Sequence, residues 1–210
     1  MLTVAILVGP VLFTSLIGAQ KIDRTVANTE PAIPDPEQLG QLYGRKLKLP
    51  ALHPGERCPV SEGSRSTVPH VGYIFCSDCL FFGRGPAYLA LLFLDNPNAD
   101  VAVMNLDKVS YRYQGAYSAK TAWVSKPDYS GPILARGRRL EGDGKLQFHF
   151  DSRGIRDLQL APLSRVDVSQ WSFWPTSLLV PGPGCYGIQI DTTRGTDVVI
   201  FEARKDGTSN

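Results

Sequence analysis

A clean alternation of apolar and polar positions marks one segment of the chain as a half-buried β-strand. Between residues 145 and 150, the apolar side chains Leu146, Phe148 and Phe150 alternate with polar ones that include His149. Period-two patterning of this kind is typical of a strand with one face on a core and the other toward solvent. We therefore expect His149 to lie on a solvent-facing side of a sheet.

Further strand-like runs recur at short intervals along the chain, with Gly, Pro, Asp and Asn between them. The continuous apolar run from Ala87 to Leu94 fits a strand buried on both faces. The basic and apolar residues of Arg45–Pro50 fit an edge strand, because lysines there discourage strand addition. Short strands separated by turn residues predict a sandwich or barrel. The remaining runs are 71–82, 101–104, 119–125, 131–140, 155–160, 176–180, 185–191 and 197–203.

The densest turn signal in the chain is Pro181-Gly182-Pro183-Gly184, which lies between two of these runs. Proline fixes φ and glycine frees it, so the chain must turn sharply there. We expect the runs 176–180 and 185–191 to form a hairpin around this turn, with Cys185 opening its second strand.

A short helix is predicted before the strands begin. Asp35 can cap it, Pro36 suits the first helical position and Gln38 completes a capping-box pattern. Gly44 supplies an end, so we expect a helix over Pro36–Tyr43.

The first nineteen residues read as an export signal. They are uncharged and mostly apolar, and they end in small residues, so cleavage is expected after Ala19. An uncleaved membrane anchor and an internal core segment are the alternatives. We expect a signal peptide at 1–19, a flexible tether with the short helix at 20–44, a single sandwich domain at 45–204 and a disordered tail at 205–210.

Composition narrows the class of protein further. Of the 210 residues, 22 are basic and 20 acidic, a balance that argues against a nucleic-acid partner. Glycine and proline number 20 and 16, which favours many turns over long helices.

Several short motifs resemble an uncharacterised family of secreted bacterial β-rich proteins. The likeness implies secretion and a β-rich fold, but no activity, cofactor or site residue. It extends over residues 45–203, and its motifs are Cys58-Pro59-Val60-Ser61, Gly85-Pro86-Ala87-Tyr88, Tyr129-Ser130-Gly131-Pro132 with the following Ile133–Leu140, and Pro183-Gly184-Cys185-Tyr186.

The chain has four cysteines, an even number behind an export signal, which suggests disulfides in three possible connectivities. Cys58 opens the folded domain and Cys185 opens one of the last strands, so we expect Cys58–Cys185 together with Cys76–Cys79. Pairing of Cys58 with Cys76 or Cys79 is the alternative. Cys76 and Cys79 are followed by no amphipathic helix, so redox chemistry is disfavoured.

Residues that could carry chemistry give weak signals. The cysteines together with His53 and His70 match no zinc-ligand spacing, so no metal and no cofactor is expected. None of the histidines, His149 included, lies in a known catalytic motif.

The tryptophans Trp123, Trp171 and Trp174 give a more specific hypothesis. Exposed on a secreted sandwich, they could stack on sugar rings or form a protein interface. The usual burial of aromatic residues favours the alternative, in which they close the ends of the core.

Basic residues concentrate in one third of the chain and could form a patch for an anionic polymer. Acidic residues, among them Glu141, Asp143, Asp151 and Asp157, interleave with them, which favours a mixed solvated surface. The arginines are Arg136, Arg138, Arg139, Arg153, Arg156 and Arg165.

Together these patterns predict a secreted or envelope-associated antiparallel β-sandwich of immunoglobulin-like type. We expect a non-catalytic interaction or structural module with a protein or polysaccharide partner, and no membrane span after signal cleavage. A carbohydrate-binding module that uses exposed aromatics and a hydrolase with a loop-assembled site are the alternatives. A planar row of exposed Trp or Tyr would favour the first of these, and a pocket holding a histidine or a carboxylate pair of perturbed pKa the second.

Overall fold

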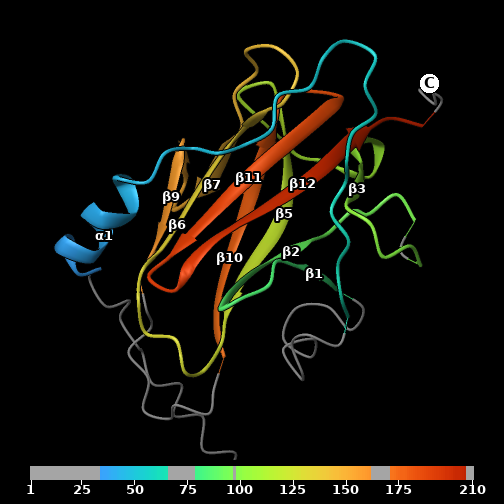
Figure 1. Ribbon diagram of the computed structural model, residues 1–210. Helices are drawn as coiled ribbons and strands as arrows, with labels where there is room; N and C mark the ends of the chain where they lie inside the picture. The colour runs from blue at the N-terminus through green and yellow to red at the C-terminus, as the bar shows by residue number, and fades with distance from the viewer. Residues whose placement is uncertain (1–33, 66–78, 97, 162–170, 207–210) are drawn as a thin grey trace, which may run out of the picture.

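Strands dominate the computed structural model, which describes residues 34–65, 79–96, 98–161 and 171–206. Within these residues one α-helix and one 3₁₀ helix accompany twelve strands in two sheets (Figure 1). The all-β sandwich with a short N-terminal helix that the sequence predicts is therefore confirmed.

The larger sheet has seven strands, and every pairing in it is antiparallel. The strands β5 (Ala116–Ser125) and β10 (Ser172–Val180) lie at its centre. Outward from β5 are β2 (Ala87–Leu91), β1 (Leu80–Phe82) and the short β4 (Arg112–Tyr113), and outward from β10 are β7 (Gln147–Phe150) and β8 (Arg153–Ile155).

The smaller sheet has five strands and contains one parallel pair. Its order is β3 (Val103–Asn105), β12 (Gly195–Arg204), β11 (Gly184–Thr192), β6 (Ile133–Arg139) and β9 (Asp157–Leu160). β3 and β12 are parallel, and the other neighbours are antiparallel. The 3₁₀ helix η1 (Leu106–Lys108) follows β3.

The core lies between the two sheets and confirms the alternation predicted around β7. Leu146 and Phe148 are buried, whereas His149 is only half-buried on the opposite face. All five residues of β2 are buried, as expected for a strand covered on both sides. Trp123 and Tyr186 are among the largest side chains with almost no exposure.

The helix α1 (Pro36–Tyr43) has the predicted bounds. Asp35 caps it, because its carboxylate accepts a hydrogen bond of 3.0 Å from the backbone N–H of Glu37. Leu42 is its buried residue, and the hydroxyl of Tyr43 accepts a 2.7 Å hydrogen bond from Gln159.

The Pro-Gly turn connects the two sheets and does not form a hairpin, which corrects the sequence prediction. β10 ends at Val180 in the seven-stranded sheet, and β11 begins at Gly184 in the five-stranded sheet. Both strands already have neighbours on both edges, β5 and β7 for β10 and β12 and β6 for β11. The single strand predicted over residues 155–160 is also divided between the two sheets. β8 ends at Ile155 in the seven-stranded sheet, and β9 begins at Asp157 in the five-stranded sheet.

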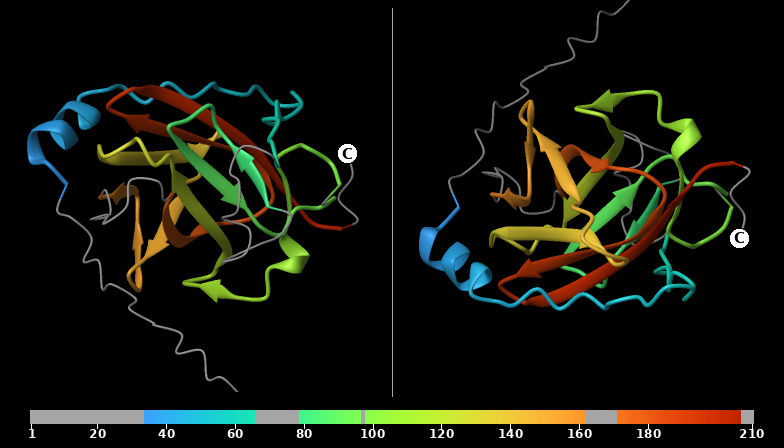
Figure 2. Two further views of the ribbon diagram at one scale, coloured as in Figure 1. Left: turned by 90° about the horizontal axis from the view of Figure 1, so that it is seen from below. Right: turned by 90° about the horizontal axis from the view of Figure 1, so that it is seen from above.

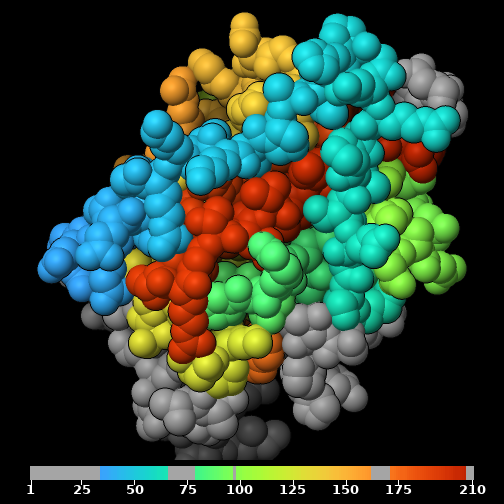
Figure 3. Space-filling model, in the orientation of Figure 1, coloured from blue at the N-terminus to red at the C-terminus, as the bar shows by residue number. Residues whose placement is uncertain are grey.

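The segment Arg45–Pro50 is not an edge strand, which is a second correction. It belongs to an extended segment, residues 45–61, that crosses the outer face of the five-stranded sheet and that we call the strap (Figures 2 and 3). The backbone N–H of Lys48 donates to Gln189 Oε1 at 2.6 Å, and Gln189 Nε2 donates to the carbonyl of Lys46 at 3.1 Å. Sheet side chains thus satisfy backbone groups that a strand ladder would otherwise pair.

Candidate functional site

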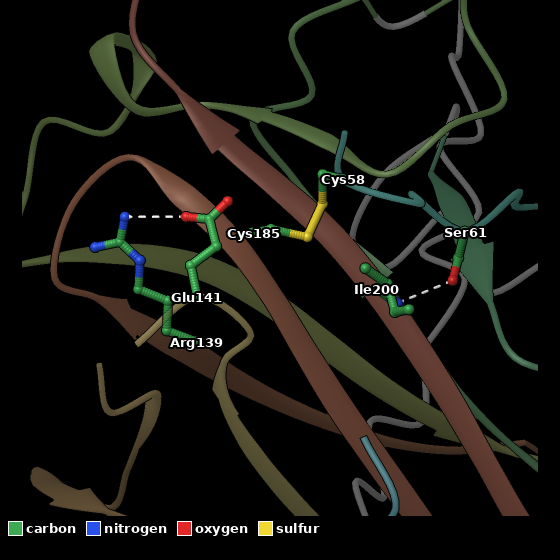
Figure 4. The surroundings of a disulfide bond; sticks show 6 residues. All are labelled: Cys58, Ser61, Arg139, Glu141, Cys185 and Ile200. Atoms are coloured by element: carbon green, nitrogen blue, oxygen red, sulfur yellow. Dashed lines mark hydrogen bonds and ion pairs between the residues drawn. A yellow bond between two sulfur atoms is a disulfide. The ribbon is translucent and has the colours of Figure 1, made fainter. Parts of the chain in front are cut away.

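The disulfide Cys58–Cys185 links the strap to the start of β11. Its Cα atoms are 5.5 Å apart, and the cysteines are 127 residues apart in sequence (Figure 4). Beside it, the hydroxyl of Ser61 accepts a 2.9 Å hydrogen bond from the N–H of Ile200. The predicted pairing of Cys58 with Cys185 is confirmed, and the alternatives that pair Cys58 with Cys76 or Cys79 are excluded.

The second expected disulfide falls partly outside the described residues. Cys79 is buried and disulfide-bonded, and none of the cysteines in the described part of the chain is free. Cys76 lies outside the described residues, so its pairing with Cys79 stays a prediction.

A completely buried carboxylate anchors the first part of the strap. The side chain of Asp191 has no solvent exposure, and its Oδ2 accepts from Arg136 Nη2 at 2.7 Å. Thr196 donates to Asp191 Oδ1 at 2.6 Å, and Gln189 Nε2 lies 2.9 Å from Oδ2. Arg136 also donates to the carbonyl of Arg45 at 2.8 Å. We interpret this group as a structural clamp, because its donors already satisfy the carboxylate.

The arginines of the predicted basic patch do not form one surface. Arg136 and Arg138 donate to strap carbonyls, and Arg139 pairs with Glu141 at 3.3 Å. Arg153 and Arg156 are exposed, and Arg165 lies outside the described residues. These contacts disfavour a single basic patch and favour the alternative, a surface on which basic and acidic side chains are mixed.

Two of the three tryptophans proposed for ligand stacking are buried, so the stacking hypothesis is wrong for them. Trp123 has no exposure and donates to Thr176 Oγ1 at 3.1 Å, and Trp174 is 6% exposed. Their positions on β5 and β10 turn them toward the core between the sheets. Trp171 is half-buried, and its ring lies 6.0 Å from that of Tyr88. It packs against an apolar cluster and offers no free planar row.

Of the other two histidines singled out in the sequence, the structure describes only His53. His53 is exposed on the strap, where its backbone N–H donates to Glu56 at 2.8 Å. His70 lies outside the described residues.

The candidate site is a groove on the outer face of the seven-stranded sheet. It has a volume of about 630 Å³ and is lined by residues 120–121, 149–152 and 175–177. The groove lies where β7 ends in its turn to β8 while β10 continues beyond it. It is larger than the pocket of about 320 Å³ beside Arg138.

Three polar side chains form a row across the floor of this groove. The register places Ser177 of β10 directly opposite Lys120 of β5 on one side and His149 of β7 on the other. Residues directly opposite each other in a sheet point to the same face. Because Leu178 and Phe148, their chain neighbours, are in the core, the row faces outward.

The row continues to β8 and is covered there by an aromatic ring. Gly154 lies opposite His149, and a Cβ at Gly154 would come within 3.5 Å of the ring of Tyr113. The rings of Tyr113 and His149 have their centroids 4.4 Å apart at 31°. Tyr113 therefore holds the imidazole in place at one end of the row.

Beneath the row, two inward threonines of the same strands are hydrogen-bonded to each other. Thr121 and Thr176 share a hydrogen bond of 2.8 Å, and Trp123 donates to the same Thr176 hydroxyl. This buried network fixes β5 against β10, and so fixes the positions of Lys120 and Ser177.

Groups with a shifted pKa mark structural contacts at the edge of the sandwich. The hydrogen bond from Arg204 holds the pKa of Asp95 below its ordinary value and raises that of Arg204 itself. A hydrogen bond between Tyr117 and Lys205 lowers the pKa of the phenol, and Arg112 lies over the same ring, 3.2 Å from its centroid. We interpret these pairs as stabilising contacts near the C-terminal strand.

The sequence singled out His149 but did not identify Lys120 or Ser177 as site residues. Each is a polar residue in a strand, a signal shared with many solvent-facing positions. Only the register of β5, β10 and β7 brings them together. Across the described ranges, no group of histidine, cysteine and carboxylate side chains could hold a metal ion, and no helix there has the length and apolar character to cross a membrane.

Comparisons with known protein families, with curated proteins and with solved structures find no match to this chain.

Proposed function

We propose that this chain is a non-catalytic interaction module of the secreted or extracytoplasmic space that binds its ligand in the groove of the seven-stranded sheet. The observation that carries the proposal is the row of Lys120, Ser177 and His149. Within the described part of the chain, none of these side chains makes a hydrogen bond or an ion pair. Polar groups left free in a concave site are available to a ligand, and they set its orientation.

The rigidity of the floor supports binding. β10 is paired with β5 along all nine of its residues and with β7 at Ser177–Leu179. A site on such a central strand loses little conformational entropy when a ligand binds, which favours affinity.

An oxidising location is supported by the disulfide Cys58–Cys185. Stable disulfides of this kind are typical of exported proteins. The apolar segment 1–19, the expected export signal, lies outside the described residues, so export remains part of the proposal.

The shape of the groove favours a narrow ligand over a broad protein surface. Clefts that bind small ligands have volumes of about 300–1,000 Å³, and the groove, at about 630 Å³, falls in this range. Pro175 lies in β10 just beyond the residues that pair with β7 and lacks an N–H. A proline at this place disfavours the addition of a peptide strand.

The test is to fill the groove. Ser177→Trp places a large ring on its floor, and Ala51→Trp adds the same ring on the strap, over the other sheet. Both variants and the wild type are run through native gels containing soluble polysaccharides and are titrated against labelled unstructured peptides. We expect at least one polymer to bind the wild type and Ala51→Trp but not Ser177→Trp. If no polymer binds, or if Ser177→Trp binds equally well, the proposal is wrong.

A hydrolase is the second candidate function, because His149 and Ser177 lie directly opposite each other in the same groove. A histidine beside a serine could act as its general base. Release of new reducing ends or of acyl products by the wild type, lost in Ser177→Ala, would favour this candidate over the non-catalytic one.

A further inference from the structure

We infer that the groove recognises an acidic saccharide, a sugar that carries a carboxylate. This inference rests on the proposed function and names the chemical class of its ligand.

The charge points to a ligand with a single anionic group. Lys120 is exposed and is the basic residue that lines the groove. Lys120 and Ser177 are opposite each other in the register, so their side chains leave the sheet at neighbouring points of the groove and the Lys120 ammonium group can reach a ligand bound at the Ser177 hydroxyl. A carboxylate placed there receives one charge-assisted hydrogen bond and one from the hydroxyl. Phosphate sites usually add arginine forks or several backbone N–H groups, and the described lining of this groove contains no arginine.

Hydrogen-bonding groups of both kinds surround this point. His149 flanks Ser177 on the side away from Lys120, and Asp151 lines the turn that follows β7. Asp151 has a φ of 50°, so the turn backbone is in the left-handed region. Within the described residues, Asp151 has no hydrogen bond or ion pair from its side chain. A carboxylate and an imidazole can accept from and donate to the vicinal hydroxyls of a sugar, which a simple carboxylic acid lacks.

Apolar surface completes the match to a sugar ring. Pro175 is exposed in the lining and lies two residues from Ser177 along β10, on the same face of the sheet. Its ring gives the C–H face of a pyranose a surface to pack on, while the hydroxyls of the sugar reach the polar row. The same proline disfavours an extended peptide as occupant, so a saccharide is the better fit of the two.

The experiment compares matched acidic and neutral ligands by isothermal titration calorimetry. The probes are a short oligouronate and the same oligosaccharide with its carboxylates methyl-esterified. We expect the oligouronate to bind the wild type about 10- to 100-fold more tightly than the ester, because the ester cannot accept the charge-assisted hydrogen bond from Lys120. Its affinity should also fall as salt is raised.

Substitutions at Lys120 test the site itself. Lys120→Met keeps the length of the side chain and removes the charge, and Lys120→Glu reverses it. Lys46→Glu is the matched control, because Lys46 is exposed on the strap and its side chain makes no hydrogen bond or ion pair within the described residues. We expect both Lys120 variants to lose the preference for the oligouronate, with melting temperatures near that of the wild type, and Lys46→Glu to retain it.

The outcomes separate this inference from the proposed function. Equal binding of acid and ester, or an unchanged preference in Lys120→Glu, overturns the acidic specificity, while groove binding blocked by Ser177→Trp would still stand. Binding of peptides alone at the groove overturns the saccharide class. A preference shown by the wild type and Lys46→Glu but lost in both Lys120 variants supports the inference.

Discussion

Arg136 Nη2 lies 2.7 Å from Oδ2 of Asp191, a carboxylate with no solvent exposure, and the same nitrogen donates to the carbonyl of Arg45 in the strap. This one guanidinium nitrogen therefore joins β6, β11 and the strap. Removing one partner of a buried pair leaves the other charge without compensation, which costs more than the pair itself contributes.

We expect Asp191→Asn to destabilise the domain by about 3–5 kcal/mol, because the Arg136 charge loses its counterion in a buried place. Urea unfolding followed by tryptophan fluorescence measures the change. Asp128→Asn is the control, because its pair with Arg194 is largely exposed, and little change is expected there. A loss at Asp191 no larger than that at Asp128 would contradict the interpretation of the buried group as a clamp.

Loss of the disulfide Cys58–Cys185 should lower the free energy of unfolding by an amount similar to that expected for Asp191→Asn. The bridge closes a loop of more than 100 residues, so the chain-entropy model gives a stabilisation of about 5 kcal/mol. The double variant Cys58→Ala, Cys185→Ala should unfold at a much lower urea concentration than the wild type. An unchanged midpoint would contradict the prediction.

The two core tryptophans should respond differently to substitution by phenylalanine. Trp123 Nε1 donates to Thr176, whereas Trp174 Nε1 is buried and has no hydrogen-bond partner among the residues that the structure describes. Trp123→Phe loses a hydrogen bond and leaves the hydroxyl network short of a donor, and Trp174→Phe removes a group that is already unsatisfied. We expect Trp123→Phe to cost about 1 kcal/mol more than Trp174→Phe in urea unfolding. Equal costs would mean that lost volume dominates both changes.

The pair Asp95–Arg204 should make stability depend on pH in the acid range. Because the hydrogen bond from Arg204 lowers the pKa of Asp95 in the folded state, the pair stabilises the protein above the unfolded pKa of aspartate, about 3.9. This stability is lost as the pH falls through the lower pKa of the folded state. Since the pair is partly exposed, we expect no more than about 1 kcal/mol.

Asp95→Asn should accordingly be less stable than the wild type at pH 7, and the difference should shrink as the pH falls below about 3.9 and through the lower pKa of the folded state. Thermal unfolding at a series of pH values measures this difference. A difference that stays constant across the series would show that Asp95 acts through its shape or its contact with Asn105 and not through its charge.

The sequence predicted those features that depend on local chain chemistry. Asp35 and Pro36 define the helix start because capping involves only neighbouring residues. The alternation around Phe148 identified a strand and its buried face, because side chains alternate along any strand. The positions of Cys58 and Cys185, at the two ends of the domain, suggested the bridge that the structure contains.

Features that depend on which strands become neighbours could not be predicted. The Pro181–Gly184 turn has the same local chemistry whether it closes a hairpin or connects two sheets, and only the partners of β10 and β11 decide between them. Arg45–Pro50, the first part of the strap, has the composition of an edge strand. The side chains of Gln189 and Arg138, which are distant in sequence, nevertheless bond to its backbone in place of a neighbouring strand. The groove also depends on which strands become neighbours. Lys120, His149 and Ser177 are ordinary polar residues of three separate strands, and they share one site because the register of the seven-stranded sheet, fixed by packing of the core beneath it, sets them side by side.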